Sequence, residues 1–276
     1  MSVLATGKIN YRVRIERAQL LGERYPFAQQ ILSFYTRMAQ FQKELYGQLP
    51  KIMPAHRLSS EDSRFRSEFC AQEMLEPFGK FLALVTAAGP APLSAHSAQL
   101  KSQGKIVWAD LLRGFWERGM LETGSEEPLT DFVVRAVLQP YAELLAGAQM
   151  SPAVVGTTCR CPLCNSLPLL GVLRQEGDGG KRLLQCSFCS HEWEFRRIFC
   201  ANCGEEQEQK LPVYVAEQFP HIRVECCEAC KKFLRTIDLT KDGHAVPLVD
   251  DLAAIPLTLW AQENGYTRIQ DNLLGT

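Results

Sequence analysis

The first half of the chain carries apolar residues at helical spacing. From Pro26 onward they recur alternately four and three positions apart, at Phe27, Ile31, Phe34, Met38, Phe41 and Leu45. Such a stripe occupies one face of a helix, and Pro26 suits the first helical position. Core packing is the favoured explanation of the stripe. A partner-binding groove or a coiled coil is the alternative, which a run of about three heptads supports less well.

Three further stretches have helical patterns, over residues 62–88, 106–118 and 129–146. Proline lacks the backbone N–H and clashes with the preceding turn of a helix. Pro77 therefore predicts a kink or break in the first stretch, and Pro140 an interruption in the last.

A loop is predicted after the first of these stretches, where Gly89, Pro90 and Pro92 cluster. Cys70 lies among apolar residues on that predicted helix. We expect it to be a buried structural thiol, because reduced cysteine packs as a small hydrophobe. The helical patterns together predict an all-helical N-terminal domain over residues 1–155.

The pattern changes near residue 151, where helical periodicity gives way to cysteines, short apolar runs and turn residues. Residues 169–174 and 181–185 flank a glycine-rich turn and predict a β-hairpin. Residues 211–217 and 221–225 predict a second hairpin. The tail, residues 246–276, is expected to be a short helical segment, with Asp250 or Asp251 as its N-cap.

Four Cys-x-x-Cys turns lie in the second half of the chain: Cys161/Cys164, Cys186/Cys189, Cys200/Cys203 and Cys227/Cys230. One such turn brings two sulfurs to the separation required by a tetrahedral ion with metal–sulfur bonds of about 2.3 Å, and two turns complete a site. Four turns at this spacing are a strong signal for two four-cysteine metal sites.

An internal repeat indicates which turns combine. The first and third turns are 39 residues apart and the second and fourth are 41 apart. Within each half, a predicted hairpin separates the two turns. Sequential pairing is therefore favoured over an interleaved arrangement, and predicts two tandem rubredoxin-like units over residues 156–198 and 199–245.

The residue after each turn bears on its regularity. Asn165 and Gly204 follow the first turn of each unit, and both residue types tolerate the left-handed backbone that such turns often require. Ser190 and Lys231 follow the second turns and tolerate it less readily. We therefore expect the second turn of each unit to be less regular.

Three other side chains compete for ligand positions. Cys159 can replace Cys161 through a longer spacing, and Cys226 can replace its neighbour Cys227. His191 follows the second turn closely, but four complete cysteine pairs leave no vacancy for it. We expect it to be a surface residue or to support the ligands from outside the site.

Composition and charge narrow the function. The chain is 46% hydrophobic, enough for a core, and its longest nearly apolar run, residues 81–88, is far shorter than the ~18 residues of a membrane span. The first residues lack the apolar region of a secretory signal, so cytoplasmic residence and no membrane insertion are expected. Cytosolic cysteines stay reduced, which favours metal sites over disulfides.

The expected four-cysteine sites are poorly suited to metal-dependent catalysis and to nucleic-acid binding. Four thiolates leave no open coordination position for hydrolysis, and no familiar catalytic or nucleotide-binding motif is present, so we expect no enzyme. Residues 159–240 carry eleven Lys or Arg and eleven Asp or Glu, which gives no basic excess for nucleic acid. A nucleic-acid-binding zinc ribbon therefore stays an alternative only. Thiolates accept iron or zinc, and iron would permit a rubredoxin-like electron carrier.

The chain resembles the FdhE family of formate dehydrogenase accessory proteins across nearly its whole length. The resemblance rests on the first turn with its flanking Asn165, and on these motifs: RLLQCSFCSHEWEFRRIFCANC from Arg182, the Cys227/Cys230 pair, VDDLA from Val249, GYTR from Gly265 and VRAVLQPY from Val134. Family members typically have glycine where this chain has Asn165, a departure that leaves the ligands unaffected.

The resemblance implies a helical domain followed by two rubredoxin-like units, with the eight cysteines of the four turns as ligands. It implies two bound iron ions, with zinc as a substitute. It also implies a cytoplasmic accessory protein that binds the catalytic subunit of respiratory formate dehydrogenase during maturation. Cys161 and Cys164 are the ligands that it marks as most important for activation of the partner.

Overall fold

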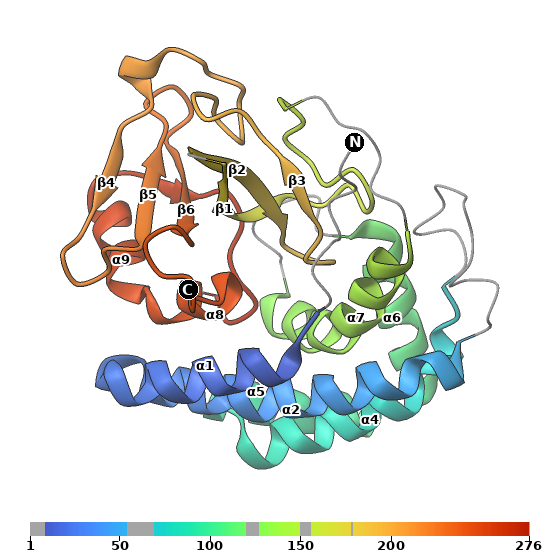
Figure 1. Ribbon diagram of the computed structural model, residues 1–276. Helices are drawn as coiled ribbons and strands as arrows, with labels where there is room; N and C mark the ends of the chain where they lie inside the picture. Colours follow the sequence, from blue (N-terminus) through green and yellow to red (C-terminus); the bar gives the residue numbers. More distant parts are fainter. Residues whose placement is uncertain (1–8, 54–68, 120–126, 150–155, 178, 276) are drawn as a thin grey trace.

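The computed structural model describes residues 9–53, 69–119, 127–149, 156–177 and 179–275. The first half is helical and the second half is built on a sheet, which lies against the helices (Figure 1). The helices of the first half are α1 (Tyr11–Arg24), α2 (Gln29–Ile52), α4 (Ala71–Ala88), α5 (Ala91–Gln103), α6 (Lys105–Arg118) and α7 (Pro128–Ala148), with the short 3-10 helix η1 (Pro26–Ala28) before α2.

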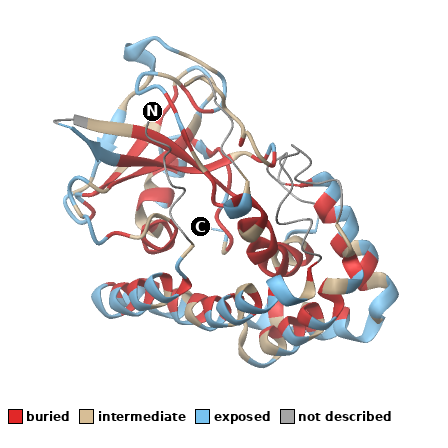
Figure 2. Ribbon diagram, turned by 45° about the vertical axis from the view of Figure 1, so that its right-hand side comes forward, coloured by how far each residue is buried: buried red, intermediate tan, exposed pale blue. Residues whose placement is uncertain are grey.

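The apolar stripe of α2 packs into the core, as the favoured explanation predicted. Phe34, Met38 and Leu45 are buried. The exception is Phe27, which is 49% exposed because it lies in η1, before α2 begins. Figure 2 shows the same division along the other helices, whose buried faces turn toward the interior and whose exposed faces turn outward.

The helix boundaries that were predicted from proline positions are wrong. α4 continues through Pro77 and α7 through Pro140, so neither helix is broken. Both prolines are buried, and the packing of these helices outweighs the one backbone hydrogen bond that each proline removes. The predicted loop after Gly89 is also wrong. Helix α5 begins at Ala91, where Pro92 lies in the first turn and no N–H is needed.

The start of the helix predicted over residues 62–88 lies outside the described residues, and α4 begins at Ala71. Cys70 is the N-cap residue of α4 and is only partly buried. The expectation of a fully buried thiol within a helix was therefore wrong, because the extended N-cap backbone holds this residue at the end of α4.

The second half forms one mixed sheet with the strand order β3-β2-β1-β6-β5-β4, and β7 pairs with β6. Its strands are β1 (Pro168–Glu176), β2 (Gly179–Cys186), β3 (Glu192–Glu194), β4 (Val213–Val215), β5 (Ile222–Cys226), β6 (Lys232–Asp238) and β7 (Thr267–Arg268). Both predicted hairpins are present, β1 with β2 and β4 with β5. A helical region followed by a small sheet is the predicted fold class, which is confirmed at this level.

The internal repeat is visible in the topology. Each half contributes a hairpin followed by a third strand, in the order β3-β2-β1 and then β6-β5-β4. β1 and β6 pair in parallel and join the halves, with Gly171 opposite Thr236. A Cβ at Gly171 would lie 2.2 Å from Oγ1 of Thr236, so this close pairing requires glycine. Because one sheet contains both halves, the predicted division at residues 198 and 199 stays a prediction.

The C-terminal segment contains α8 (Pro247–Ala253) and α9 (Ile255–Glu263). Asp250 and Asp251 lie inside α8 and are buried, so neither is its N-cap, which is Val246. The predicted cap was wrong because both carboxylates are engaged in buried ion pairs, Asp250 with Arg17 and Asp251 with Arg235 and Arg268. Among the residues described, no helix combines the length and apolar character needed to cross a membrane.

Candidate metal centres

The fold gathers the eight cysteines of the four turns into two groups, in the sequential pairing that the repeat favoured. Cys161, Cys164, Cys186 and Cys189 form the first group, and Cys200, Cys203, Cys227 and Cys230 the second. All eleven cysteines lie within the described residues, and all are free thiols.

The sulfur separations fit a tetrahedral ion. In the first group, Sγ of Cys161 is 3.6 Å from Sγ of Cys189, and the Cys164–Cys186 separation is 3.3 Å. In the second group the two separations are 3.8 and 3.7 Å. Metal–sulfur bonds of about 2.3 Å in a tetrahedron put the sulfurs about 3.8 Å apart, whereas a disulfide bond is about 2.05 Å long. Each group is thus suited to one divalent ion.

All four turns share one backbone geometry. The N–H of the first cysteine donates to the carbonyl five residues later, at 2.8–2.9 Å in every case. The residue after each turn has a left-handed backbone, with φ of 61° at Asn165, 56° at Ser190, 78° at Gly204 and 53° at Lys231. The expectation of less regular second turns was wrong. The hydrogen bond that closes each turn holds this conformation even where the residue is not Asn or Gly.

Backbone N–H groups point at two of the sulfurs. Phe188 N donates to Sγ of Cys186 at 3.4 Å, and Asn202 N to Sγ of Cys200 at the same distance. Burial raises the pKa values of the Cys186 and Cys189 thiols, and that of Cys200. Buried thiolates of this kind need a compensating cation, which a divalent ion at the centre of each group would supply.

The first group is buried against the helical region. Phe188, inside the second turn, is fully buried and meets the rings of Phe115 and Trp116 from α6 edge-on, each with its centroid 5.8 Å away. All four cysteines of this group are buried as well. The turn therefore fixes the sheet to the helices.

Polar contacts from two helices hold the same turn. Oγ of Ser190 donates to Glu143 of α7 at 2.6 Å, and Glu143 is also paired with Arg14 of α1 at 2.8 Å. Arg135 of α7 donates to the carbonyl of Ser187 at 2.8 Å. Burial lowers the pKa of Arg135 to about 10, although the charge of the nearby Cys186 acts to raise it. Arg135 therefore places a positive charge beside the thiols of the first group.

The second group is more accessible. Cys203 is exposed and Cys230 is partly exposed, whereas Cys200 and Cys227 are buried. The second group therefore borders solvent at two of its four cysteines, whereas all four cysteines of the first group are buried.

The remaining candidate ligands lie outside both groups. The thiol of Cys159 lies 3.7 Å from the carbonyl oxygen of Cys200, so it borders the second group although it precedes Cys161 by two residues. Cys226 is buried beside Cys227, and burial raises its pKa to about 12. His191 is 3% exposed, so the surface placement was wrong. Its carbonyl accepts the closing hydrogen bond from Cys186, so His191 is part of the buried turn and not of a surface loop.

A third cluster, which the sequence did not reveal, joins α1 to α8. His221 Nε2 lies 2.9 Å from Asp250, and Arg17 bonds to both Asp250 and Asp242. These residues have metal-ligand chemistry, but the guanidinium of Arg17 already supplies the cation that the carboxylates need. We read the cluster as a buried ion-pair network. Its only signal in the sequence is the aspartate pair in VDDLA.

Comparison with known proteins identifies relatives. Two family models match the chain, "FdhE, central domain" over residues 160–197 and "FdhE, C-terminal domain" over residues 184–274. A protein of Aquifex aeolicus named "Protein FdhE homolog" is 27% identical over 270 residues, covering 95% of this chain and 94% of that protein. A protein of the same name from Pseudomonas aeruginosa is 36% identical over 153 residues, which are 53% of this chain and 49% of the relative.

A solved structure extends the similarity to the helical region. The crystal structure of the FdhE protein from Pseudomonas aeruginosa superposes on this chain with a TM-score of 0.72 and 26% identity, covering 99% of each chain. The similarity in fold therefore includes the helices that precede the two matched family domains.

Proposed function

Because the chain belongs to the FdhE family, we propose that it is a cytoplasmic accessory protein of formate dehydrogenase. In this proposal the chain binds the catalytic subunit of that enzyme during maturation and catalyses no reaction itself. The observation that carries the proposal is the pair of four-cysteine groups on a fold shared with FdhE.

We further propose that each group holds one iron ion, with zinc as the alternative occupant. Iron in an all-thiolate site can exchange one electron, whereas zinc would only fix the geometry. The ligands would be the four cysteines of each group. Tetrathiolate closure leaves no position for substrate, which supports a role in docking or electron exchange over hydrolysis.

The two groups are suited to different tasks. Cys203 is exposed and Cys230 is partly exposed, so the second group is the one that a partner can approach. The first group lies in the interior, where Phe188 and Ser190 contact the helices and hold the sheet against them. We therefore place partner contact at the second group, and assign Cys161 and Cys164, which the family resemblance favoured, to the integrity of the fold.

A deletion strain of the source organism, complemented with variants, tests the proposal. Wild-type protein should restore formate oxidation, and Cys203→Ser should not, although the chain accumulates. Cys70→Ser is the matched control, because Cys70 is a partly buried cysteine outside both groups. Full formate oxidation in the deletion strain itself would refute the accessory function. Full restoration by Cys203→Ser would refute the assignment of partner contact to the second group.

Anaerobic purification followed by elemental analysis and absorption spectroscopy tests the metal. Two irons per chain with reversible thiolate-to-iron bands would support electron exchange. Two zincs per chain in protein that fully restores formate oxidation would leave a docking protein whose metals only shape its surface.

A further inference from the structure

Arg135 of α7 is a buried cation that has no carboxylate partner among the described residues. It belongs to the motif VRAVLQPY and is 6% exposed. Its Nη2 donates to the carbonyl of Ser187 at 2.8 Å and its Nη1 to that of Asp271 at 3.3 Å, while the buried Nε has no acceptor in the described part of the chain. These carbonyls orient the guanidinium and leave its charge uncompensated. A buried charge is costly unless an opposite charge lies nearby.

The first cysteine group supplies that opposite charge when it holds a metal ion. Four thiolates and one divalent ion carry a net charge of −4 + 2 = −2. Another arginine at the same turn, Arg14, is 2.8 Å from Glu143, so its charge is already compensated. Ser187, which accepts from Arg135, directly follows the candidate ligand Cys186. Arg135 is therefore a cation available to balance a metal-loaded first group.

A single peptide unit connects the guanidinium of Arg135 to a sulfur. The carbonyl of this unit, from Ser187, accepts the 2.8 Å hydrogen bond from Arg135, and its N–H, from Phe188, donates to Sγ of Cys186 at 3.4 Å. The two hydrogen bonds reinforce each other, because a donor at the carbonyl polarises the amide and makes its N–H a stronger donor. Arg135 thus acts on the sulfur both through space and along this peptide.

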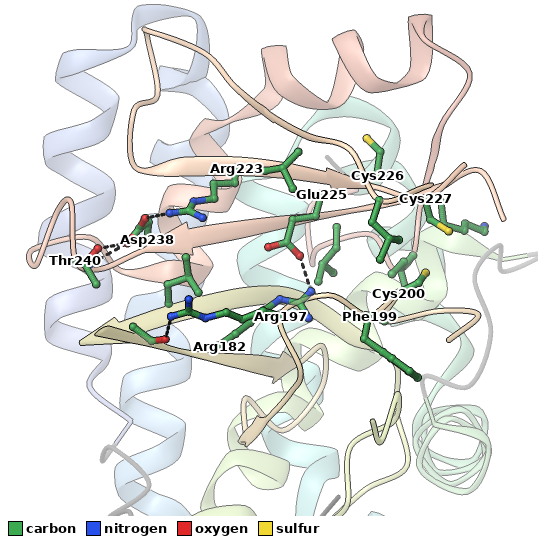
Figure 3. Close-up of a pocket in the computed structure, with 18 of the residues that line it drawn as sticks. Arg182, Arg197, Phe199, Cys200, Arg223, Glu225, Cys226, Cys227, Asp238 and Thr240 are labelled. Atoms are coloured by element: carbon green, nitrogen blue, oxygen red, sulfur yellow. Dashed lines mark hydrogen bonds and ion pairs between the residues drawn. The ribbon is translucent and has the colours of Figure 1, made fainter. Parts of the chain in front are cut away.

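Within the described residues, the second group has no equivalent of this arrangement. Asn202 N also donates to a sulfur, Sγ of Cys200, at 3.4 Å. In the structure as described, however, no arginine or lysine donates to the carbonyl of Ala201, which belongs to the same peptide unit as that N–H. Figure 3 shows a pocket that Cys200 and Arg182 both line, and Arg182 is bonded to Glu225 at 2.5 Å. This arginine near the second group is therefore already compensated.

We propose that Arg135 stabilises the metal-loaded form of the first group, as the counter-charge of its thiolates and as the donor to the Ser187–Phe188 peptide. Arg135 is a positioning residue in this role, because it acts on the ion through that peptide and Cys186. The inference rests on the proposed occupation of the first group by a metal ion, and adds a reason why this group can remain a permanent anchor between the sheet and the helices.

Cadmium NMR of the full chain tests the proposal, because cadmium binds the same soft thiolate ligands and gives a separate signal at each site. The chain is loaded with two cadmium ions and titrated with a competing chelator. Cys203→Ser changes the signal of the second group and so assigns both signals. In Arg135→Gln, the first group should bind cadmium about tenfold or more weakly, the usual scale when a group that supports a metal ligand is removed. The second group of the same molecule should keep its wild-type affinity.

Two further variants separate charge from packing. Arg135→Lys keeps the positive charge and a donor for Ser187, so its first-group affinity should lie closer to wild type than that of Arg135→Gln. Arg17→Gln is the matched control, because it removes a different buried arginine, which lies 2.5 Å from Asp250. This control should leave the cadmium affinity of both groups unchanged.

Proton NMR of the same cadmium-loaded samples measures the peptide directly. The amide proton of Phe188 should move upfield in Arg135→Gln, because its hydrogen bond to Cys186 weakens. The amide proton of Asn202, which donates to Cys200, should not move. An unmoved Phe188 signal would overturn the route through the peptide.

Three results of the cadmium titration overturn the proposal. Equal first-group affinity in wild type and Arg135→Gln would show that the charge does not act on the metal. Equal losses in Arg135→Gln and Arg135→Lys, or equal losses at both groups, would show a general loss of packing. A wild-type chain that binds cadmium only at the second group would refute the proposed metal occupation of the first group itself, which is a failure distinguishable from the other two.

Discussion

Replacing Asp251 by asparagine should destabilise the protein more than any exposed charge change of the same kind. The Asp251 carboxylate is fully buried and meets three side chains. Nε of Arg235 lies 2.8 Å from it, Arg268 donates to both of its oxygens at 2.6 and 2.7 Å, and Asn272 donates at 2.9 Å. Asparagine keeps the shape and removes the charge, so the variant tests electrostatics without opening a cavity.

The expected cost follows from the burial of both arginines. The side chains of Arg235 and Arg268 are 0% and 2% exposed, so each guanidinium depends on this carboxylate for compensation. Burial and the proximity of Arg268 lower the pKa of Arg235 to about 9, although Asp251 acts to raise it. The charged form of Arg235 is therefore disfavoured even when Asp251 is present. Breaking a buried pair by removing one partner typically costs about 3–5 kcal/mol in the free energy of unfolding.

Urea unfolding followed by far-UV circular dichroism measures this cost. The control is Asp110→Asn, because Asp110 is 68% exposed and paired with an exposed Arg113 at 2.9 Å. Its effect should stay below about 0.5 kcal/mol. If Asp251→Asn costs no more than Asp110→Asn, the buried network does not stabilise the fold and the reasoning fails.

Three further predictions concern the metals and pH. A competing chelator should empty the second group at least about tenfold faster than the first, because Cys203 is exposed; stopped-flow release in one phase would contradict this. Cys159→Ser and Cys226→Ser should each retain two ions per chain by elemental analysis, since neither residue lies in a four-cysteine group. Burial opposes the lowered pKa of Asp251, but Arg235 and Arg268 prevail, so the stability it confers is present above about pH 3.9 and is lost as pH falls further. The difference in unfolding free energy between wild type and Asp251→Asn, measured by urea unfolding, should therefore stay constant between pH 5 and 7 and narrow as pH falls below about 3.9.

The cysteine groups could be predicted because their information is local. Each turn closes over five residues, and the repeat spacing separates sequential from interleaved pairing without any knowledge of the sheet. The hairpins are equally local, since the strand patterns and the turn lie next to one another. Helix boundaries near proline were harder to predict. Pro77 and Pro92 look alike in sequence, yet one lies inside a helix and the other in the first turn of the next.

The rest of the fold depends on contacts between distant residues. β1 and β6 are paired in parallel although Gly171 and Thr236 are 65 positions apart. No local sequence pattern predicts this pairing. Arg17 and Asp250 are separated by 233 positions, so their ion pair could not be found from spacing. The motifs VDDLA and GYTR were recognisable, but only the structure explains them. They supply Asp251 and Arg268, the two halves of one buried pair.

The duplicated units show how similar turns acquire different roles. The second turn of the first unit contains Ser187 and Phe188, and the equivalent positions in the second unit are Glu228 and Ala229. An aromatic ring can fill a space between helices, as Phe188 does against α6, whereas a carboxylate and a methyl group cannot. The second turn therefore stays at the surface, where the hydroxyl of Tyr266 donates to Glu228. Identical backbone geometry thus serves as an anchor in one unit, and leaves Cys203 exposed and Cys230 partly exposed in the other.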